Sequence, residues 1–432
     1  MTTTFEKIGK IDYQSAADMI DSFNESTERS NWRKKSATSF VELAMPGKPD
    51  EAWRRVRLSP VLLDKALEDC QIGYDGIPSG VSVYSLSELS GDGFKEYETY
   101  ITRYTELSKL RAAKDKPRAN DVKENKLLSL NKAFSQNGLF IVADENFSSG
   151  DVLRFQFSTQ SDKIVAIPQI HLWAKKGSKG QILIEFIAKE DSKNVIIPYS
   201  TGVIEDNAEW EVLTNQETDD NSQFYMFDSY YMQTKSKFSS YLFTQGAKQS
   251  FVDGHYTLQG RKAEFHMYGI STAQGKQVQG EKLSVEHHAP ETISDTSFRC
   301  VLYDSATSIF AGNIKIPKGS SGSEGYEENK NLLLGEDCFT HAIPQLEIIE
   351  NDVKCSHGAT VSSTEPEELY FLMARGLTQK AAEELLVRSF YRDILDKMSL
   401  LNDHPEIKSY LYNLTEKKTG LNLNKNVYNW EE

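Results

Sequence analysis

The spacing of apolar and polar positions divides the chain into three regions, which are residues 1–135, 136–360 and 361–432. The first region combines helices with loops. Ala17, Ile20 and Phe23 recur at the spacing of one helix face. A second helical pattern ends at Pro117, because proline cannot continue a helix. We therefore expect an N-terminal helical region.

From about Gly138 onward, apolar residues occupy every second position, which is the pattern of strands with one buried face. Turn-forming residues separate the runs, and no amphipathic helix interrupts them before about Thr360. The residues expected to point inward on two of these strands are Ile182, Ile184, Phe186, Ala263, Phe265 and Met267. Several small β-sandwich domains would produce this pattern. A β-helix with coils of roughly 20 residues would also produce it, and no strict repeat decides between them.

After Thr360 the helical spacing returns. Thr364 is the predicted N-cap of a first helix, and Glu367 completes a capping box. Pro366 lies in the first turn, and Gly376 ends the helix. The next segment has one apolar stripe, made of Ala382, Leu385, Leu386, Phe390, Ile394 and Met398. The pattern thus predicts a mainly β core between two helical regions.

Composition narrows the class of protein. The 432 residues include 26% charged and 39% hydrophobic residues, as in a soluble globular chain. The net charge of −14 argues against a nucleic-acid binder and against binding to an anionic membrane surface. No apolar run approaches the ~20 residues of a membrane span, and the N-terminus does not resemble a secretory signal. Four cysteines are too few for a disulfide framework, so we expect the reducing cytoplasm.

Two motifs look functional but do not meet the requirements of the sites they resemble. The stretch GISTAQGKQ from Gly269 is similar to a phosphate-binding loop, but it has one residue too many between its glycines. Gln277 also stands where serine or threonine should bind magnesium, so we interpret the stretch as a hairpin turn. His287 and His288 are adjacent and would face opposite ways on a strand. We expect them in a solvated loop.

The strongest candidate for chemistry is the segment NDVKCSHGAT, residues 351–360. Cys355 and His357 are two residues apart, so on a strand they point to the same face, and both can bind metal. The plain alternative is a buried free cysteine beside a hydrogen-bonded histidine. Together with Cys338 and His341 they form the pattern C-x2-H-x13-C-x-H. Zinc accepts these ligand types, although the spacing is not that of a common zinc finger.

In a β-helix the same spacing has another meaning. Cys338 lies 17 residues before Cys355 and 19 before His357, which is about one coil of the expected length. Residues one coil apart stack at about 4.8 Å, so these side chains would line neighbouring coils. Thiolates and imidazole are ligands of iron–sulfur clusters. Because these residues cannot complete the coordination of a cluster, a second chain would have to supply the other ligands.

A longer stretch around these residues resembles the SufB/SufD family of the SUF iron–sulfur assembly machinery. It is YEENKNLLLGEDCFTHAIPQLEIIENDVKCSHGATVSSTEPEELYFLMARGL, in which PQLEI, DVKCSHGAT and ELYFLMARGL are close to the family's core signature. The resemblance is specific over residues 299–390 and looser over residues 260–277. It is weak before about residue 130, apart from PDEAWRRVRLS. CSHGAT is similar to SufD, since SufB typically has glutamate where Gly358 stands.

The resemblance implies a fold, a role and partners. The fold would be a right-handed parallel β-helix between helical regions. The role would be that of a non-catalytic scaffold that assists cluster assembly and iron acquisition. The scaffold would pair with a SufB-like paralogue through the β-helix and bind the SufC ATPase, which hydrolyses ATP, through its C-terminal helices. A transient iron–sulfur cluster or iron would be shared at the subunit interface, with His357 as a ligand from this chain.

Two departures from the family pattern leave an alternative open. Many SufD chains lack a cysteine at the position of Cys338, whereas SufB uses one there as a cluster ligand. The alternative is therefore a SufB-like scaffold that carries the cluster through Cys338 and Cys355. The family's D-H-H-T is QGEK here, at residues 279–282, so no role of those histidines carries over. A polysaccharide-acting β-helix enzyme would need a secretion signal, which the N-terminus does not resemble.

Overall fold

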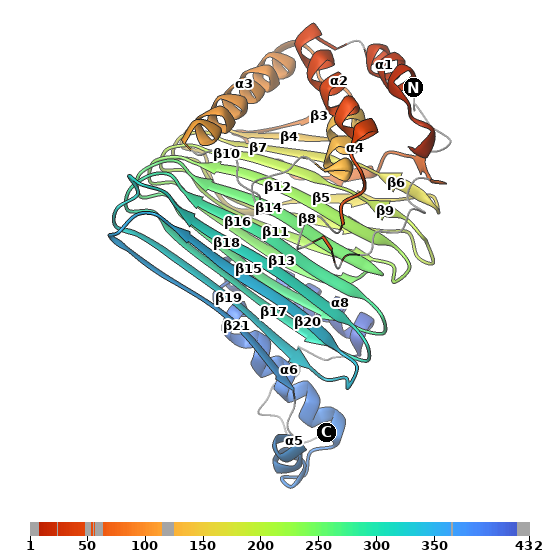
Figure 1. The fold of residues 1–432 in the computed structure, drawn as a ribbon, viewed down its shortest axis with the longest axis vertical. Helices are drawn as coiled ribbons and strands as arrows, with labels where there is room; N and C mark the ends of the chain where they lie inside the picture. The colour runs from red at the N-terminus through yellow and green to blue at the C-terminus, as the bar shows by residue number, and fades with distance from the viewer. Residues whose placement is uncertain are drawn as a thin grey trace.

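The computed structural model describes residues 8–23, 25–47, 53, 54, 56, 64–114, 125–363 and 366–420. Its centre is formed by two β-sheets, and successive strands of the core alternate between them (Figure 1). This arrangement confirms the parallel β-helix and excludes a series of small sandwiches. The N-terminal helices lie at one end of the β-helix, and the helix of residues 366–373 lies at the other (Figure 1).

The strands divide between two sheets, A and B. Sheet A contains β1 (Ala66–Leu67), β3 (Val81–Ser85), β4 (Gly138–Ala143), β6 (Ile164–Ala166), β7 (Gln169–Ala174), β9 (Val195–Ile196), β10 (Tyr199–Ile204), β12 (Gln223–Met232), β14 (Gln249–Leu258), β16 (Val278–His287), β18 (Thr307–Ile316) and β20 (Phe339–Ile348). Sheet B contains β2 (Gln71–Tyr74), β5 (Ser148–Ser158), β8 (Lys179–Ile187), β11 (Glu209–Thr218), β13 (Lys237–Gly246), β15 (Glu264–Ala273), β17 (Ile293–Leu302), β19 (Ser323–Leu333) and β21 (Val353–Ser363). The helices are η1 (Ile8–Lys10), α1 (Tyr13–Ser22), α2 (Thr27–Glu42), α3 (Gly91–Lys114), α4 (Lys126–Phe134), α5 (Pro366–Met373), α6 (Gln379–Leu395), α7 (Ser399–Asp403) and α8 (Pro405–Thr419).

One coil consists of a strand of sheet A, a corner, a strand of sheet B and a second corner. Phe227 pairs with Asp253, 26 residues later, and Ala311 pairs with Ile343, 32 residues later. The expected coil length of roughly 20 residues was therefore wrong. Strands such as β14 and β15 are 10 residues long, so two strands already take up that length before the corners are added.

The corner from sheet A to sheet B has the same backbone conformation in successive coils. It contains a residue with positive φ, in the left-handed region that glycine adopts most easily. These residues are Asn207 (φ 59°), Lys235 (57°), Lys262 (61°), Glu291 (58°) and Gly322 (74°). A regular structural repeat therefore exists, although its residue type changes from coil to coil.

Apolar side chains fill the space between the two sheets. Ile182, Ile184, Phe186, Ala263, Phe265 and Met267 all belong to this core, which confirms the predicted inward face of both strands. Phe265 stacks on Phe238 of the preceding coil, with ring centroids 6.0 Å apart. Tyr256 of sheet A lies against the same ring at 4.2 Å. Rings from successive coils and from both sheets thus pack in one continuous core.

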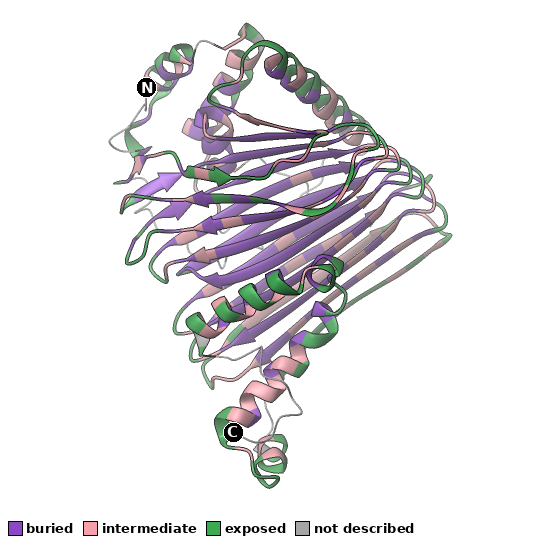
Figure 2. Cartoon of the chain, turned by 180° about the vertical axis from the view of Figure 1, so that it is seen from behind, coloured by how far each residue is buried: buried purple, intermediate pink, exposed green. Residues whose placement is uncertain are grey.

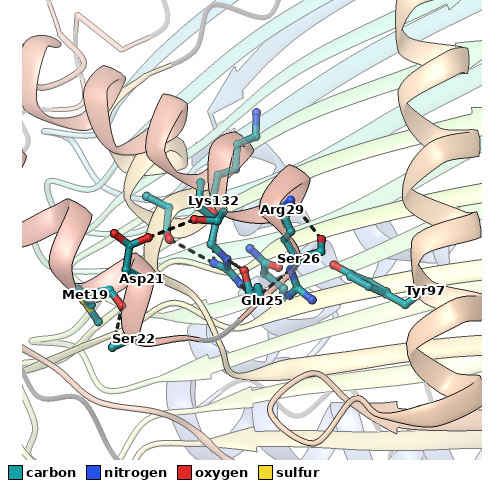
Figure 3. A network of polar contacts seen from close by, with 12 residues as sticks. Met19, Asp21, Ser22, Glu25, Ser26, Arg29, Tyr97 and Lys132 are labelled. Carbon is teal, nitrogen blue, oxygen red and sulfur yellow. Dashed lines mark hydrogen bonds and ion pairs between the residues drawn. The ribbon is translucent and has the colours of Figure 1, made fainter.

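The N-terminal helices cover the outer face of sheet A. Tyr100 of α3 hydrogen-bonds to Thr201 across 2.7 Å. The guanidinium group of Arg33 in α2 is almost fully buried, and its charge is balanced by Glu25, with Nε 2.7 Å from Oε2. Arg29 lies over the ring of Tyr97 of α3. Figure 3 shows Glu25 and Arg29 in this polar network, next to Tyr97.

Helices α6, α7 and α8 pack on the outer face of sheet B, and Figure 2 shows helices lying against its strands. Of the predicted apolar stripe, Ala382, Ile394 and Met398 are buried, whereas Leu385, Leu386 and Phe390 are half-buried. The buried face of α6 also includes Val387, Tyr391 and Leu395. Arg299 of β17 links α6 to the sheet through an ion pair, in which its Nη2 atom lies 2.6 Å from Oδ2 of Asp393.

Two loop predictions were wrong. Gly269 lies in β15 of sheet B and Gln277 immediately precedes β16 of sheet A, so GISTAQGKQ spans a coil corner instead of a hairpin. His287 and His288 are buried at the end of β16. They do face opposite ways: His287 hydrogen-bonds to Thr292 and Ser294 at the corner, and His288 contacts Glu286 at 2.8 Å. Each histidine therefore has partners of its own and does not chelate with its neighbour.

The two sheets also include strands that lie before residue 136. Strands β1, β2 and β3 come from the N-terminal region and pair with the two sheets. Gly376 follows α5 with φ 97°, as the predicted helix end requires. Pro117 and Thr364 lie outside the described residues. No helix in the described part of the chain is long and apolar enough to cross a membrane.

Candidate metal centre

The candidate residues lie in the last coil of the β-helix. Strands β20 and β21 are the final strands of sheets A and B, and among the described residues no further strand pairs with their outer edges. Most of β20 is half-buried and most of β21 is exposed, whereas the strands one coil earlier are mostly buried. The last coil therefore presents unpaired backbone groups and side chains that earlier coils enclose.

Cys355 and His357 lie side by side on β21, as the sequence predicted. They pair with Gly325 and Glu327 of β19. A Cβ atom on Gly325 would lie 2.9 Å from Ile314 of sheet A, so this column of residues faces the space between the sheets. Cys355 is half-buried and His357 is exposed. The alternative of a buried, hydrogen-bonded histidine is excluded, because His357 has no hydrogen bond or ion pair to any residue that the structure describes.

The contacts across the core place residues of the two sheets opposite each other. In the preceding coil, Gly312 lies opposite Glu327, since a Cβ atom on Gly312 would be 1.9 Å from the Glu327 carboxylate. Gly312 pairs with Pro344 of β20, and Glu327 pairs with His357 of β21. Extending this arrangement by one coil therefore places Pro344 opposite His357, and Leu346 opposite Cys355.

Cys338 does not join the pair. It lies eight residues before Leu346, which corresponds to about 26 Å along the strand direction. Cys338 and Cys355 belong to the same coil, at opposite ends of its strands, and do not stack on neighbouring coils as predicted. The prediction failed because it assumed coils that were too short. His341 lies between these positions, and its ring is next to Phe339.

The positions of these residues determine whether one chain can bind a metal ion by itself. Within the described residues, no three side chains of His, Cys, Asp or Glu are placed to hold one metal ion as they stand. The four-residue zinc site that the spacing allowed is therefore not formed. Cys355 and His357 remain as a pair of candidate ligands that share one face.

The thiols of the last coil have different surroundings. Cys338 packs against a buried cluster that includes Cys300 and Leu302, and its Sγ lies 3.5 Å from the carbonyl oxygen of Asp304. Burial raises the pKa of both Cys338 and Cys355 above the usual value for a thiol. Because metals bind the thiolate, binding at either residue must displace a proton.

The sequence reasoning missed Glu327. This residue precedes His357 by 30 positions and pairs with it in the parallel ladder. Its side chain is buried on the face that also carries Cys355 and His357. A correct coil length of about 30 residues would have identified this neighbour from spacing alone.

Comparison with known proteins identifies a related family. A family profile described as "SUF system FeS cluster assembly, SufBD core domain" matches residues 157–390. The iron-sulfur cluster assembly protein SufD of Escherichia coli is 22% identical over 228 residues, covering 53% of this chain and 54% of the relative. SufD of Bacillus subtilis is 35% identical over 118 residues, covering 27% of this chain and 26% of the relative.

A longer match covers most of the chain. An iron-sulfur cluster assembly SufBD family protein of Staphylococcus saprophyticus is 23% identical over 411 residues, covering 83% of each chain. The two SufD matches, in contrast, span about half and about a quarter of the relatives' own lengths.

Burial predicts the order in which the thiols react. We expect iodoacetamide to modify Cys355 and Cys338 faster than Cys300, because burial raises the pKa of Cys300 to about 12 and encloses its thiol. The rates for Cys355 and Cys338 should rise with pH above neutrality as the thiolate fraction grows. Peptide mass spectrometry over time measures each rate, with Cys70, which is also buried, as an internal control. Modification of Cys300 at the rate of Cys355 would contradict the described packing.

Proposed function

The chain belongs to the family of SUF-system iron–sulfur cluster assembly proteins that share the SufBD core domain, and from this premise we propose that it is a SufD-like scaffold subunit. It assists cluster assembly and iron acquisition together with a SufB-like paralogue and a SufC-type ATPase. The scaffold is non-catalytic, and ATP hydrolysis belongs to the ATPase. The transient cluster or iron is its cargo. The free thiols of the described cysteines support a cytoplasmic location.

One observation carries the proposal: Cys355 and His357 lie on the open coil, where a second chain has access to them. A neutral imidazole nitrogen and a thiolate both bind iron, and two ligands leave most positions of a cluster open. A partner that pairs with β20 and β21 would bring further ligands to the same place. Iron–sulfur assembly at such an interface would require both chains, which is the role proposed for the heterodimer.

The unpaired edges of the last coil support the partner proposal. The outer edges of β20 and β21 present backbone donors and acceptors that a strand of another chain can use. Ile348, Ile349 and Val361 are large apolar residues of the same coil and are exposed. Apolar side chains around open strand edges are a favourable surface for pairing with a similar β-helix.

The C-terminal helices support the ATPase proposal. α6, α7 and α8 bury their apolar faces on sheet B. α5 exposes Tyr370, Phe371 and Met373, and Tyr370 is 74% exposed. An apolar cluster of this kind suits a protein partner, so we assign α5 to the binding of the SufC-type ATPase.

The alternative of a SufB-like scaffold fits less well. It needs Cys338 and Cys355 to carry one cluster from a single chain. At a separation of about 26 Å along the strands, they cannot both bond directly to one cluster. Cys338 would have to act with ligands from a different chain.

Replacing His357 tests the cluster proposal. We expect His357→Ala to abolish cluster assembly in anaerobic reconstitution with the partner subunits, because alanine offers no ligand to iron. Since His357 is exposed, the free energy of unfolding should change by less than about 0.5 kcal/mol. Absorbance of the cluster and thermal melting measure the two effects.

Two further variants serve as controls for the His357→Ala result. Thr360 lies on the same strand, but its side chain is on the other face. The variant Thr360→Ala should therefore assemble clusters as the wild type does. Cys338→Ser separates the two scaffold types. Loss of clusters in Cys338→Ser, with normal yield in His357→Ala, would establish the SufB-like role and refute the SufD-like one.

A charge on the last coil tests the pairing surface. We expect Ile348→Glu to weaken the complex with the SufB-like partner at least tenfold, because burying an unpaired carboxylate at an interface is costly. Light scattering after gel filtration measures the complex. Ile101→Glu, on the exposed side of α3, is the matched control and should pair normally. An intact complex with Ile348→Glu would place the pairing surface elsewhere.

An alanine on α5 tests the docking site of the ATPase. We expect Tyr370→Ala to weaken SufC binding in a calorimetric titration by about 1–3 kcal/mol, as for other exposed aromatic anchors. Tyr13→Ala, on the N-terminal helix α1, removes an equally large exposed side chain and should bind normally. Equal binding of both variants would argue against α5 as the contact.

A further inference from the structure

Glu327 is a buried carboxyl group directly beneath the candidate ligands. It lies on β19, one coil before β21, and its Cα atom pairs with that of His357 in the parallel ladder. Burial alternates along β19, with Ser323, Gly325 and Glu327 on the inward side. Glu327 therefore projects between the sheets on the same face as Cys355 and His357.

The carboxyl group of Glu327 is buried, and one of its oxygens has no hydrogen-bond partner among the described residues. The residue is 4% exposed, and its Oε1 atom has no hydrogen-bond partner among the described residues. Burial raises the pKa of Glu327 to about 8. A buried carboxyl oxygen without a partner is costly and calls for a ligand, a water molecule or an ion.

The opposite sheet makes room for this carboxyl group. A Cβ atom on Gly312 would lie 1.9 Å from Oε2 of Glu327, so any residue with a side chain would have to displace the carboxylate. Asn329 and Asn331 follow on the same inward face of β19 and are also buried. Each has one polar side-chain atom without a partner. The polar lining therefore extends beyond Glu327 along this part of the interior.

The spacing of the coils suits an ion between Glu327 and His357. Neighbouring strands of a sheet are about 4.8 Å apart. Bonds from a divalent metal ion to a carboxylate oxygen and an imidazole nitrogen are about 2.1 Å each. This spacing is compatible with an ion that is seated between the two coils and bound by both side chains. The carboxylate has to rotate away from Gly312, since the described side chains do not converge on a metal ion as they stand.

We propose that Glu327 is a third protein ligand, which holds a divalent metal ion between the last two coils together with His357 and Cys355. The identity of the ion as iron(II) rests on the proposed function. A set of one thiolate, one imidazole and one carboxylate suits a first-row divalent ion and leaves coordination positions open for sulfide or for a partner's ligand. This chain would then capture the ion before the second chain completes the site.

Cobalt(II) binding to the full-length chain tests the proposal, because cobalt absorbs light in a way that reports its ligands. We expect the wild type to bind one Co²⁺ with a thiolate charge-transfer band. Glu327→Gln should weaken this binding at least about tenfold while keeping the band, since Cys355 is unchanged. Glu281→Gln is the matched control. Glu281 is also buried, and burial raises its pKa to about 8, but it lies on β16, two coils before the last.

The outcomes separate this inference from the proposed function. Binding by Glu327→Gln at wild-type affinity, with loss in His357→Ala, overturns the role of Glu327 and leaves the role of His357 intact. Equal weakening in Glu281→Gln also overturns it, because the effect would then come from a general change of the interior. Absence of Co²⁺ binding by the wild type refutes a three-ligand site in one chain, but not a cluster completed by a partner.

The fold of each variant is checked by thermal melting without metal. If Glu327→Gln does not fold, Glu327→Asp decides the same question, because it keeps the charge and withdraws the carboxylate by one methylene. Wild-type Co²⁺ affinity in Glu327→Asp would count against the proposal, and weakened affinity would support it.

Discussion

The parallel ladder between successive coils is the interaction on which the rest of the structure depends. Each strand pairs with the strand one coil earlier, so a residue stacks on another that lies about 30 positions before it. This register aligns Phe238 with Phe265 in the interior, and Glu327 with His357 near the end. A shift of one residue would turn every inward side chain outward, so the apolar core and the candidate site share one register.

The ladder also determines where the chain is open. A β-helix satisfies the backbone of every inner strand on both sides, and it leaves unpaired groups at its two ends. Antiparallel pairing of β3 with β4 and of β2 with β5 adds a strand to each sheet at the N-terminal end. Helices from both ends of the chain cover the outer faces of the sheets. The last coil is thus the place where we propose that a partner pairs.

The interior becomes more polar toward this open end. In the middle of the core, Trp210, Phe238 and Phe265 occupy the inward column of sheet B. The equivalent positions of β19 and β21 carry Gly325 and Cys355. Buried polar atoms without partners cost stability, and several of them gather in β19. In a scaffold whose last coils bind a cargo ion, such polar groups would serve as ligands of the ion. Apolar side chains cannot do this.

The sequence by itself determined the local features of this protein. Its period-two pattern identified the inward residues of the strands, such as Ile184 and Phe265, because alternation along a strand depends on neighbours in the chain. The adjacency of Cys355 and His357 on one face followed from the same rule. The family signature around DVKCSHGAT added the β-helix, which the pattern alone had left open against a series of sandwiches.

The tertiary structure decided everything that depends on the length of a coil. The repeat is invisible in the sequence because each corner requires only a left-handed backbone, which Asn207, Lys235 and Glu291 adopt with unrelated side chains. Without the coil length, Cys338 was placed one coil from Cys355, although it lies at the far end of the same coil. Glu327 went unnoticed for the same reason. Its contact with the site runs through backbone pairing across 30 residues, and no local pattern in the chain records such a pairing.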